Sequence, residues 1–157
     1  MRLTSSAFGD GERIPERYTA DGEDLSVPLS WTDPPDETAE LALIVDDPDA
    51  PGPESWVHWV LYNIPSDSRE LAEGIPRVER PVAPEGAAQG LNSWPSENLG
   101  YRGPAPPRGH GRHRYRFVLY ALDEELDLSA GMDRDALVSA MEGHVAAETR
   151  LTGVYER

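Results

Sequence analysis

The sequence predicts a mainly β protein, an antiparallel β-sandwich with one late C-terminal helix. Three observations support this fold class: several short segments have the composition of strands, their connections are rich in turn residues, and a helical pattern occurs only near the C-terminus. The chain of 157 residues is long enough to bury a core and fits a single domain, residues 1–157.

The predicted strands are short runs rich in β-branched, aromatic and other apolar residues. They cover residues 27–31, 40–45, 56–64, 114–122 and 150–155. The run 40–45 is continuously apolar and the run 56–64 stops at Pro65, so we expect both to be central strands.

Asp133 can cap a helix over residues 134–147, because Asp is a preferred N-cap residue. Spacings of three and four place five side chains on its inward face: Leu137, Ala140, Met141, His144 and Val145. Between the second and third long strands, residues 66–112 contain seven of the 15 prolines and seven of the 14 glycines. A connection of that length is usually functional or disordered, and its aromatic residues favour an ordered binding loop.

The chain is strongly acidic. It has 29 acidic residues against 14 Lys+Arg, all of them arginine, and a formal net charge of −15. A field of this sign repels phosphate backbones and anionic lipids, so we expect no nucleic-acid binding and no stable membrane association. Because the acidic residues are spread along the chain instead of forming a tail, we interpret them as a halophilic adaptation to high intracellular salt.

The absence of cysteine excludes a disulfide framework, a thiolate metal site and a cysteine nucleophile, and is compatible with a reducing cytoplasm. No apolar run approaches the roughly 18 residues of a spanning helix, and the first ten residues lack the apolar centre of a secretion signal. We therefore expect a cytoplasmic protein, and no cofactor is expected.

The first candidate site is the stretch DDPDAPGPESWVHW, residues 46–59. Pro48 and Pro51 restrict the backbone and so point the aspartates in set directions, although a solvated turn would use the same residues. In the following strand a period of two places Trp56 and His58 on one face, and Val57 and Trp59 on the other.

The second candidate site is the stretch GYRGPAPPRGHGRHRYRF, residues 100–117. Its glycines allow close backbone approach to a ligand, and His113 and Tyr115 share a face of the strand that follows. Two imidazoles, a phenol and backbone N–H groups suit a small anion. We expect Asp47 to orient an imidazole and raise its pKa, so that anion binding strengthens as the pH falls.

Together the two stretches closely resemble the signature regions of the phosphatidylethanolamine-binding protein family, in its bacterial and archaeal branch of Raf-kinase-inhibitor-like proteins. The matching motifs are DPDAP at 47–51 with WVH at 56–58, and GPAPP at 103–107 with HRY at 113–115. The resemblance implies a Greek-key β-sandwich that binds phosphate-like anions in a small pocket at one end.

Position by position, the resemblance implies a set of ligand-binding residues: Asp47, Asp49, Trp56, His58, Gly103, Pro106, Pro107, His113 and Tyr115. It implies that the protein binds a phosphate-type anion or a phosphorylated headgroup and acts through ligand or partner binding rather than catalysis. Prokaryotic relatives often form dimers, so a homodimer or another protein partner remains open. Two departures bear on ligand shape: Ala105 stands where many eukaryotic relatives have Gly, and Ser93 where prokaryotic relatives often have Asp.

A hydrolase remains an alternative. His58 or His113 would act as general base, Asp47 would orient it, and Ser93 or a water molecule would be the nucleophile. The sequence contains no Gly-x-Ser-x-Gly turn, which argues against this alternative.

A zinc site built from His58, His113 and Asp47 is a further alternative, although the sequence has no short His-x-x-x-His pair. Of the two remaining histidines, His110 is interpreted as a mobile loop residue that could close over the pocket. His144 is interpreted as a packed or partly exposed helix residue.

Overall fold

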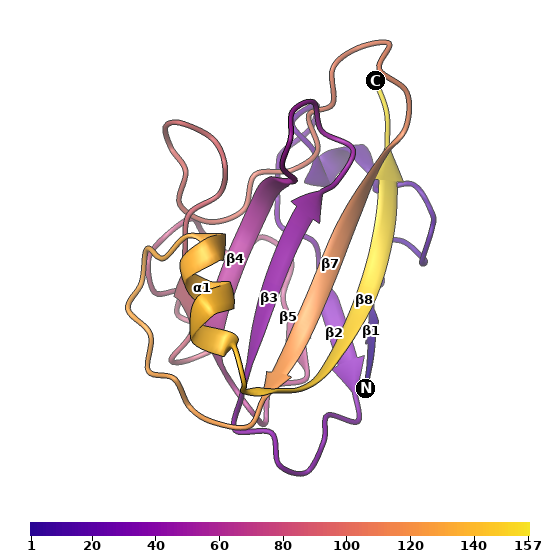
Figure 1. Ribbon diagram of the computed structural model, residues 1–157. Coiled ribbons are helices and arrows are strands. Elements are labelled where there is room, and N and C mark those ends of the chain that lie inside the picture. The colour runs from indigo at the N-terminus through magenta and orange to yellow at the C-terminus, as the bar shows by residue number, and fades with distance from the viewer.

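The structure, a computed structural model that describes residues 1–157, consists of two antiparallel sheets, one α-helix and one short 3-10 helix (Figure 1). The strands are β1 Arg2–Thr4, β2 Leu29–Thr32, β3 Glu40–Asp47, β4 Trp56–Pro65, β5 Glu70–Leu71, β6 Ala88–Gln89, β7 His113–Leu122 and β8 Val145–Tyr155; the 3-10 helix is η1 Glu16–Tyr18 and the α-helix is α1 Arg134–Met141. The predicted fold class, a mainly β sandwich with one late helix, is confirmed.

The larger sheet has the strand order β6-β4-β3-β7-β8, and the smaller sheet has the order β1-β2-β5. Strand β3 pairs with both β4 and β7, so β7 returns to lie beside β3 instead of beside its predecessor in the large sheet. This non-sequential order distinguishes a Greek-key arrangement from a simple meander.

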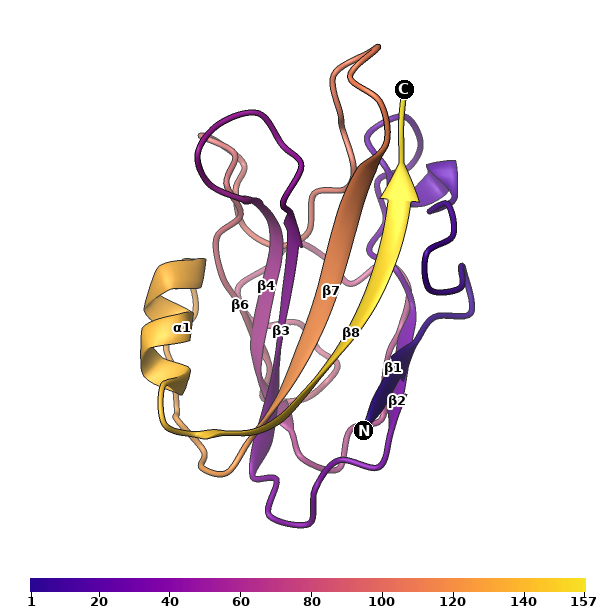
Figure 2. The ribbon, with the colours of Figure 1, turned by 45° about the vertical axis from the view of Figure 1, so that its right-hand side comes forward.

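The large sheet is covered on both faces. Figure 2 shows the small sheet on one side of it and α1 on the other. Between the sheets lies a core of 23 buried residues that includes Trp31, Leu43 and Phe117. Under α1, a second cluster joins Val60 of β4 to Leu137 of the helix. Burial on both faces explains why the central strands read as continuous apolar runs.

The helix is shorter than predicted. Asp133 caps it as expected, because its side chain accepts a hydrogen bond from Ala136 N, but α1 ends at Met141. Gly143 follows with a φ of 83°, a left-handed conformation typical of helix ends. The chain then enters β8 at Val145, which is exposed and pairs in the antiparallel ladder with Leu122 at the end of β7. The prediction of a helix over residues 134–147, with Val145 on its inward face, is therefore wrong.

The two candidate stretches meet at one end of the sandwich. Because β3 and β7 are antiparallel neighbours, the end of β3 lies beside the start of β7, with Asp46 opposite Arg116. Figure 1 shows the loop after β3 and the segment before β7 at the same end of the molecule, next to the C-terminus. The only α-helix, α1, is too short to cross a membrane.

Candidate functional site

A cavity of about 320 Å³ opens at this end of the sandwich. Its walls come from the loop after β3, the start of β4, the long connection before β7, and β7 itself. The lining residues are Asp47, Ala50, Pro51, Trp56, His58, Trp94, Ala105, Pro106, Pro107, His113 and Tyr115. All residues predicted for the site except Asp49 and Gly103 line this cavity.

A β-bulge in β4 turns His58 toward the cavity. Val45 of β3 pairs with Trp59, whereas the next residue, Asp46, pairs with Val57, so His58 is an extra residue in the ladder. As a result Val57 packs in the cluster under α1 and Trp59 packs in the core between the sheets. The expectation that Val57 and Trp59 share a face is wrong, because a bulge shifts the alternation and re-aims the side chain at the extra position.

The ring of His58 is held in one tautomer. Its Nδ1 donates to the carbonyl oxygen of Arg102 at 2.6 Å, and Arg102 N donates back to the carbonyl oxygen of His58 at 3.0 Å. A carbonyl oxygen only accepts, so Nδ1 carries the proton, and this is the one hydrogen bond that the His58 ring makes with the chain. In its neutral form, His58 therefore offers a lone pair to a ligand.

Burial lowers the pKa of His58, outweighing the Arg102 hydrogen bond and the charge of Asp47, which both raise it. The imidazole is 3% exposed, so its charged form loses hydration. For His58 the shift is thus opposite to the one expected for an imidazole close to Asp47. The neutral form is favoured at neutral pH.

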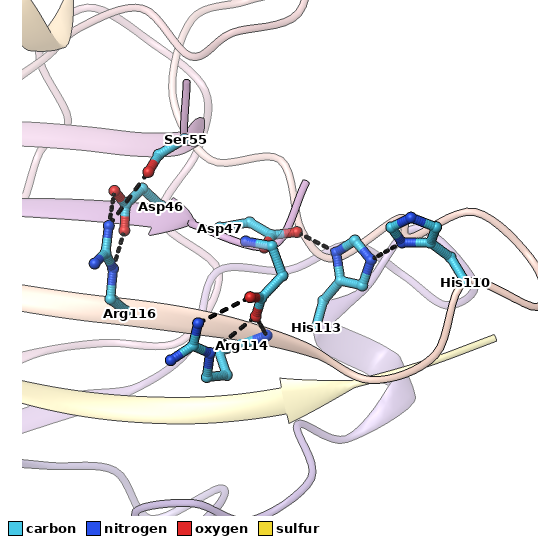
Figure 3. A network of polar contacts seen from close by, with 8 residues as sticks. Asp46, Asp47, Ser55, His110, His113, Arg114 and Arg116 are labelled. Atoms are coloured by element: carbon cyan, nitrogen blue, oxygen red, sulfur yellow. Dashed lines mark hydrogen bonds and ion pairs between the residues drawn. The ribbon is translucent and has the colours of Figure 1, made fainter. Parts of the chain in front are cut away.

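Asp47 and His113 form a buried pair that continues to His110 (Figure 3). Asp47 Oδ2 lies 2.6 Å from His113 Nδ1, and Asp47 Oδ1 accepts from the backbone N–H of Asp49 at 2.7 Å. On the other side of the ring, His113 Nε2 lies 2.6 Å from His110 Nδ1. The structure therefore brings a third histidine to the site, at the position that the sequence analysis assigned to a mobile loop.

Tyr115 supplies a hydroxyl that makes no hydrogen bond of standard geometry within the chain, although the Asp47 carboxylate is close enough to interact with it and contributes to its raised pKa. Its Oη is buried without a hydrogen-bond partner, which is rare for a buried polar atom. Burial, followed by the negative charge of Asp47, raises the pKa of Tyr115. The hydroxyl keeps its proton at neutral pH and is available to donate to a ligand.

Aromatic rings form the remaining wall. The ring of Trp94 packs edge-on against His58 with centroids 5.1 Å apart, and against Trp56 with centroids 5.4 Å apart. The guanidinium of Arg102 lies 4.6 Å from the Trp94 ring centroid, a cation–π contact. Sequence reasoning placed Trp94 in an ordered loop but not in the site. The available signal was a large aromatic residue within a long connection rich in Pro and Gly.

Asp49 does not line the cavity, and its side chain ties the loop after β3 to β7. Its carboxylate accepts from Arg114 N and Nε at 2.9 Å each and from Arg114 Nη2 at 2.8 Å. These bonds lower the pKa of Asp49 to about 2. Asp46 makes a similar pair with Arg116, at 2.8 and 2.7 Å. Both aspartates, on either side of Asp47, tie the end of β3 and the start of the following loop to β7.

Gly103 is also outside the cavity. Its N–H donates to Asp24 Oδ1 at 2.8 Å, and a Cβ at this position would lie 2.1 Å from the carbonyl oxygen of Tyr18. The glycine was expected to allow close approach of a ligand. In the structure it allows close approach of another backbone segment, which anchors the start of the Pro-rich segment 104–107.

The contacts of Ser93 do not place it near the histidines. Its Oγ accepts from Val57 N at 2.8 Å, and the residue lines a separate cavity of about 210 Å³ beside Asp133 and Arg134. No group of three or more His, Asp or Glu side chains in the structure is arranged to hold a metal ion.

Comparison with known proteins identifies the class to which this fold and pocket belong. A profile described as phosphatidylethanolamine-binding protein matches residues 4–156. A UPF0098 protein of Methanothermobacter thermautotrophicus is 53% identical, over 100% of this chain and 99% of its own length. A UPF0098 protein of Aquifex aeolicus is 44% identical, over 100% of this chain and 89% of its own length.

Solved structures agree. The phosphatidylethanolamine-binding protein homologue CT736 of Chlamydia trachomatis is 41% identical, with a TM-score of 0.85 over 99% of this chain and 97% of that one. E. coli YbcL is 29% identical, with a TM-score of 0.90 over 99% and 98%. The class is thus a small β-sandwich with a pocket at one end. The chain belongs to the phosphatidylethanolamine-binding protein family, and this membership supports ligand binding in general.

Proposed function

We propose that the protein binds a small anion, a phosphate or the phosphate group of a phosphorylated headgroup, in the cavity between the two signature stretches. The observation that carries the proposal is the buried, unpartnered hydroxyl of Tyr115, which shares this cavity with His58 and the Asp47–His113 pair. A buried donor without a partner loses free energy unless a ligand satisfies it.

The polar atoms of the cavity favour a phosphate that keeps one proton. Tyr115 Oη can donate to a phosphate oxygen, whereas His58 Nε2, in the favoured neutral form, can only accept. A monoprotonated phosphate group supplies both an acceptor oxygen and a P–OH donor. A dianion would in addition be repelled by the Asp47 carboxylate. Because the second pKa of a phosphate monoester is about 6, we expect affinity to rise as the pH falls through this value.

The charge around the cavity supports the same ligand class. Residues 98–122 contain no Asp or Glu and five of the 14 arginines, in a chain whose net charge is −15. Arg114 and Arg116 are paired with carboxylates, whereas no ion pair involves Arg108 or Arg112. Arginines without a carboxylate partner on the segment before β7 would attract an anion and oppose the repulsion from the net negative charge.

A hydrolase that uses His113 as base is less well supported. His113 Nε2 is the nitrogen that would take a proton, and it is in contact with His110. The proposed serine, Ser93, lines another cavity. Binding is therefore the function that we propose.

The sharpest test is Tyr115→Phe, which removes only the unpartnered hydroxyl. We expect the melting temperature to stay the same or rise, and the affinity for phosphate and phosphorylethanolamine to fall about tenfold, because a hydrogen bond to a charged group contributes roughly 1.5 to 3 kcal/mol. Isothermal titration calorimetry measures both ligands. The matched control is Tyr155→Phe, whose hydroxyl bonds to Asp21 outside the cavity and should leave affinity unchanged.

His58→Ala gives a second readout at the same site. We expect phosphate binding to weaken at least about tenfold, since Nε2 no longer accepts from the ligand. The control is His144→Ala, because His144 lies away from the cavity, next to Asp123 and Glu124. Unchanged phosphate affinity in both Tyr115→Phe and His58→Ala would contradict the proposed site.

A further inference from the structure

We propose that His110 is a movable cover of the site: its imidazole occupies His113 Nε2, and an incoming anion displaces it. This inference rests on the anion-binding function proposed above. It assigns a role to a loop histidine that contacts the site without lining the cavity.

The hydrogen-bond directions are set by Asp47. An ionised carboxylate only accepts, so His113 Nδ1 donates to Asp47 Oδ2, and the neutral ring keeps a lone pair on Nε2. The 2.6 Å contact between His113 Nε2 and His110 Nδ1 needs one proton between the two nitrogens, so His110 is the donor. Both imidazoles therefore donate toward Asp47, and His113 has no free site for a ligand while His110 is in place.

The ligand can replace His110 without any other change in protonation. Inorganic phosphate in its H2PO4− form has two P–OH groups, so one can donate to His58 Nε2 and the other to His113 Nε2 in place of the His110 N–H. The released His110 ring then exchanges its bond to His113 for bonds to water. The P–OH donor thus replaces the His110 N–H donor at His113 Nε2, and the hydrogen bond from His113 to Asp47 is retained.

The chain around His110 can permit this movement. Gly109 and Gly111 flank it with φ values of 75° and 87°, and a Cβ at either position would meet no atom within 4 Å. The backbone of this turn makes only long hydrogen bonds, 3.4 Å from Gly109 N to Arg157 O and 3.2 Å from His110 N to Pro107 O. His110 itself is exposed. Its short contact with His113 is thus what holds the side chain in place.

The first experiment tests the cover without a ligand. Diethylpyrocarbonate reacts with an unprotonated imidazole nitrogen, so mass-spectrometric peptide mapping can follow the modification of His113. We expect His113 to react at least about tenfold faster in His110→Ala than in the wild type, because its Nε2 becomes accessible. His144→Ala should leave the His113 rate unchanged. Equal His113 rates in the wild type and His110→Ala would overturn the cover.

The second experiment tests displacement. Calorimetry with inorganic phosphate should show binding about three- to tenfold tighter in His110→Ala, because the ligand no longer competes with a hydrogen bond inside the protein. Equal or weaker affinity would overturn displacement. If neither protein binds phosphate or phosphorylethanolamine, the proposed function fails, and displacement with it, while the modification rates still decide whether His110 covers His113.

Discussion

The site depends on which nitrogen of each imidazole carries a proton. His58 donates a hydrogen bond from Nδ1 to the carbonyl oxygen of Arg102, and His113 donates one from Nδ1 to the Asp47 carboxylate. Each ring therefore presents a lone pair on Nε2 in the neutral form. A cavity described only as rich in histidine would suggest positive donors, whereas these two neutral rings would accept hydrogen bonds, which is why the proposed ligand carries a proton of its own.

Asp47→Asn separates orientation from net charge. Removal of a negative charge from the cavity would, by electrostatics alone, tighten anion binding. However, the two Asp47 oxygens accept from His113 Nδ1 and from Asp49 N, and an Asn side chain has only one oxygen acceptor. We therefore expect phosphate affinity to fall several-fold, measured by calorimetry at two pH values. Tighter binding would show that repulsion by Asp47 outweighs its positioning of His113.

The lowered pKa of His58 makes folding stability depend on pH. The unfolded chain protonates this histidine near pH 6.5, whereas the folded protein resists protonation until a lower pH. The contribution of neutral, buried His58 to the free energy of unfolding is complete above about pH 6.5. It is lost as the pH falls from there through the pKa of His58 in the folded protein. In His58→Phe, urea unfolding at pH 7, 6 and 5 should show a smaller loss of stability than in the wild type. An equal loss of stability in His58→Phe and in the wild type would contradict the lowered pKa of His58. His144→Ala is the control for loss of a histidine outside the cavity.

Strands and loops position these side chains through contacts outside the cavity. The bulge in β4 aims His58, and the bonds between Asp49 and Arg114 hold the loop that follows Asp47. Gly103 lets the Pro-rich segment pack closely against the backbone of Tyr18. Of the residues predicted for the site, Asp49 and Gly103 thus act on the architecture around the pocket.

Gly103→Ala should disturb both stability and binding. The added methyl group would lie 2.1 Å from Tyr18 O and 2.7 Å from Asp24 Oδ1, so the segment that begins at Pro104 must shift. We expect a loss of roughly 1 to 3 kcal/mol of unfolding free energy, as for other overpacked sites, and weaker phosphate binding. Urea denaturation and calorimetry measure the two effects. In the control, Gly9→Ala, the methyl group meets only the flexible side chain of Glu12, and both quantities should change little.

Across the whole chain, the dominant physical property is the net charge of −15. Repulsion between like charges opposes the compact state, and salt reduces that repulsion. Residues 98–122, which contain no Asp or Glu, are the local exception to this acidity.

We predict that the melting temperature rises substantially between dilute buffer and molar KCl. The Debye length falls from about 30 Å at 0.01 M salt to about 3 Å at 1 M, so the repulsion should be largely screened well below the highest concentration. Differential scanning calorimetry in KCl, compared with the more strongly excluded sulfate, separates screening from general salting-out. A melting temperature that stays flat across the KCl series would contradict the halophilic interpretation.

Local patterns were sufficient for the strand segments 40–45, 56–64 and 114–122 and for the cap at Asp133, whereas the convergence of the two signature stretches was expected from the family resemblance. The strand segments and the cap depend on near neighbours: alternation, Pro and Gly positions, and a capping side chain. Even the end of α1 was misjudged, because pairing of Val145 with β7 competes with the continuation of the helix.

Only the tertiary structure decided which side chains complete the pocket. The bulge at His58 arises from its register against β3, and the contact of Trp94 with His58 crosses 36 positions of the chain. His110 and His113 are neighbours in sequence, but their bond is directed by Asp47, which lies 66 positions from His113. No local pattern encodes such contacts, because their geometry is set by how distant strands pair and by which backbone segments pack against each other.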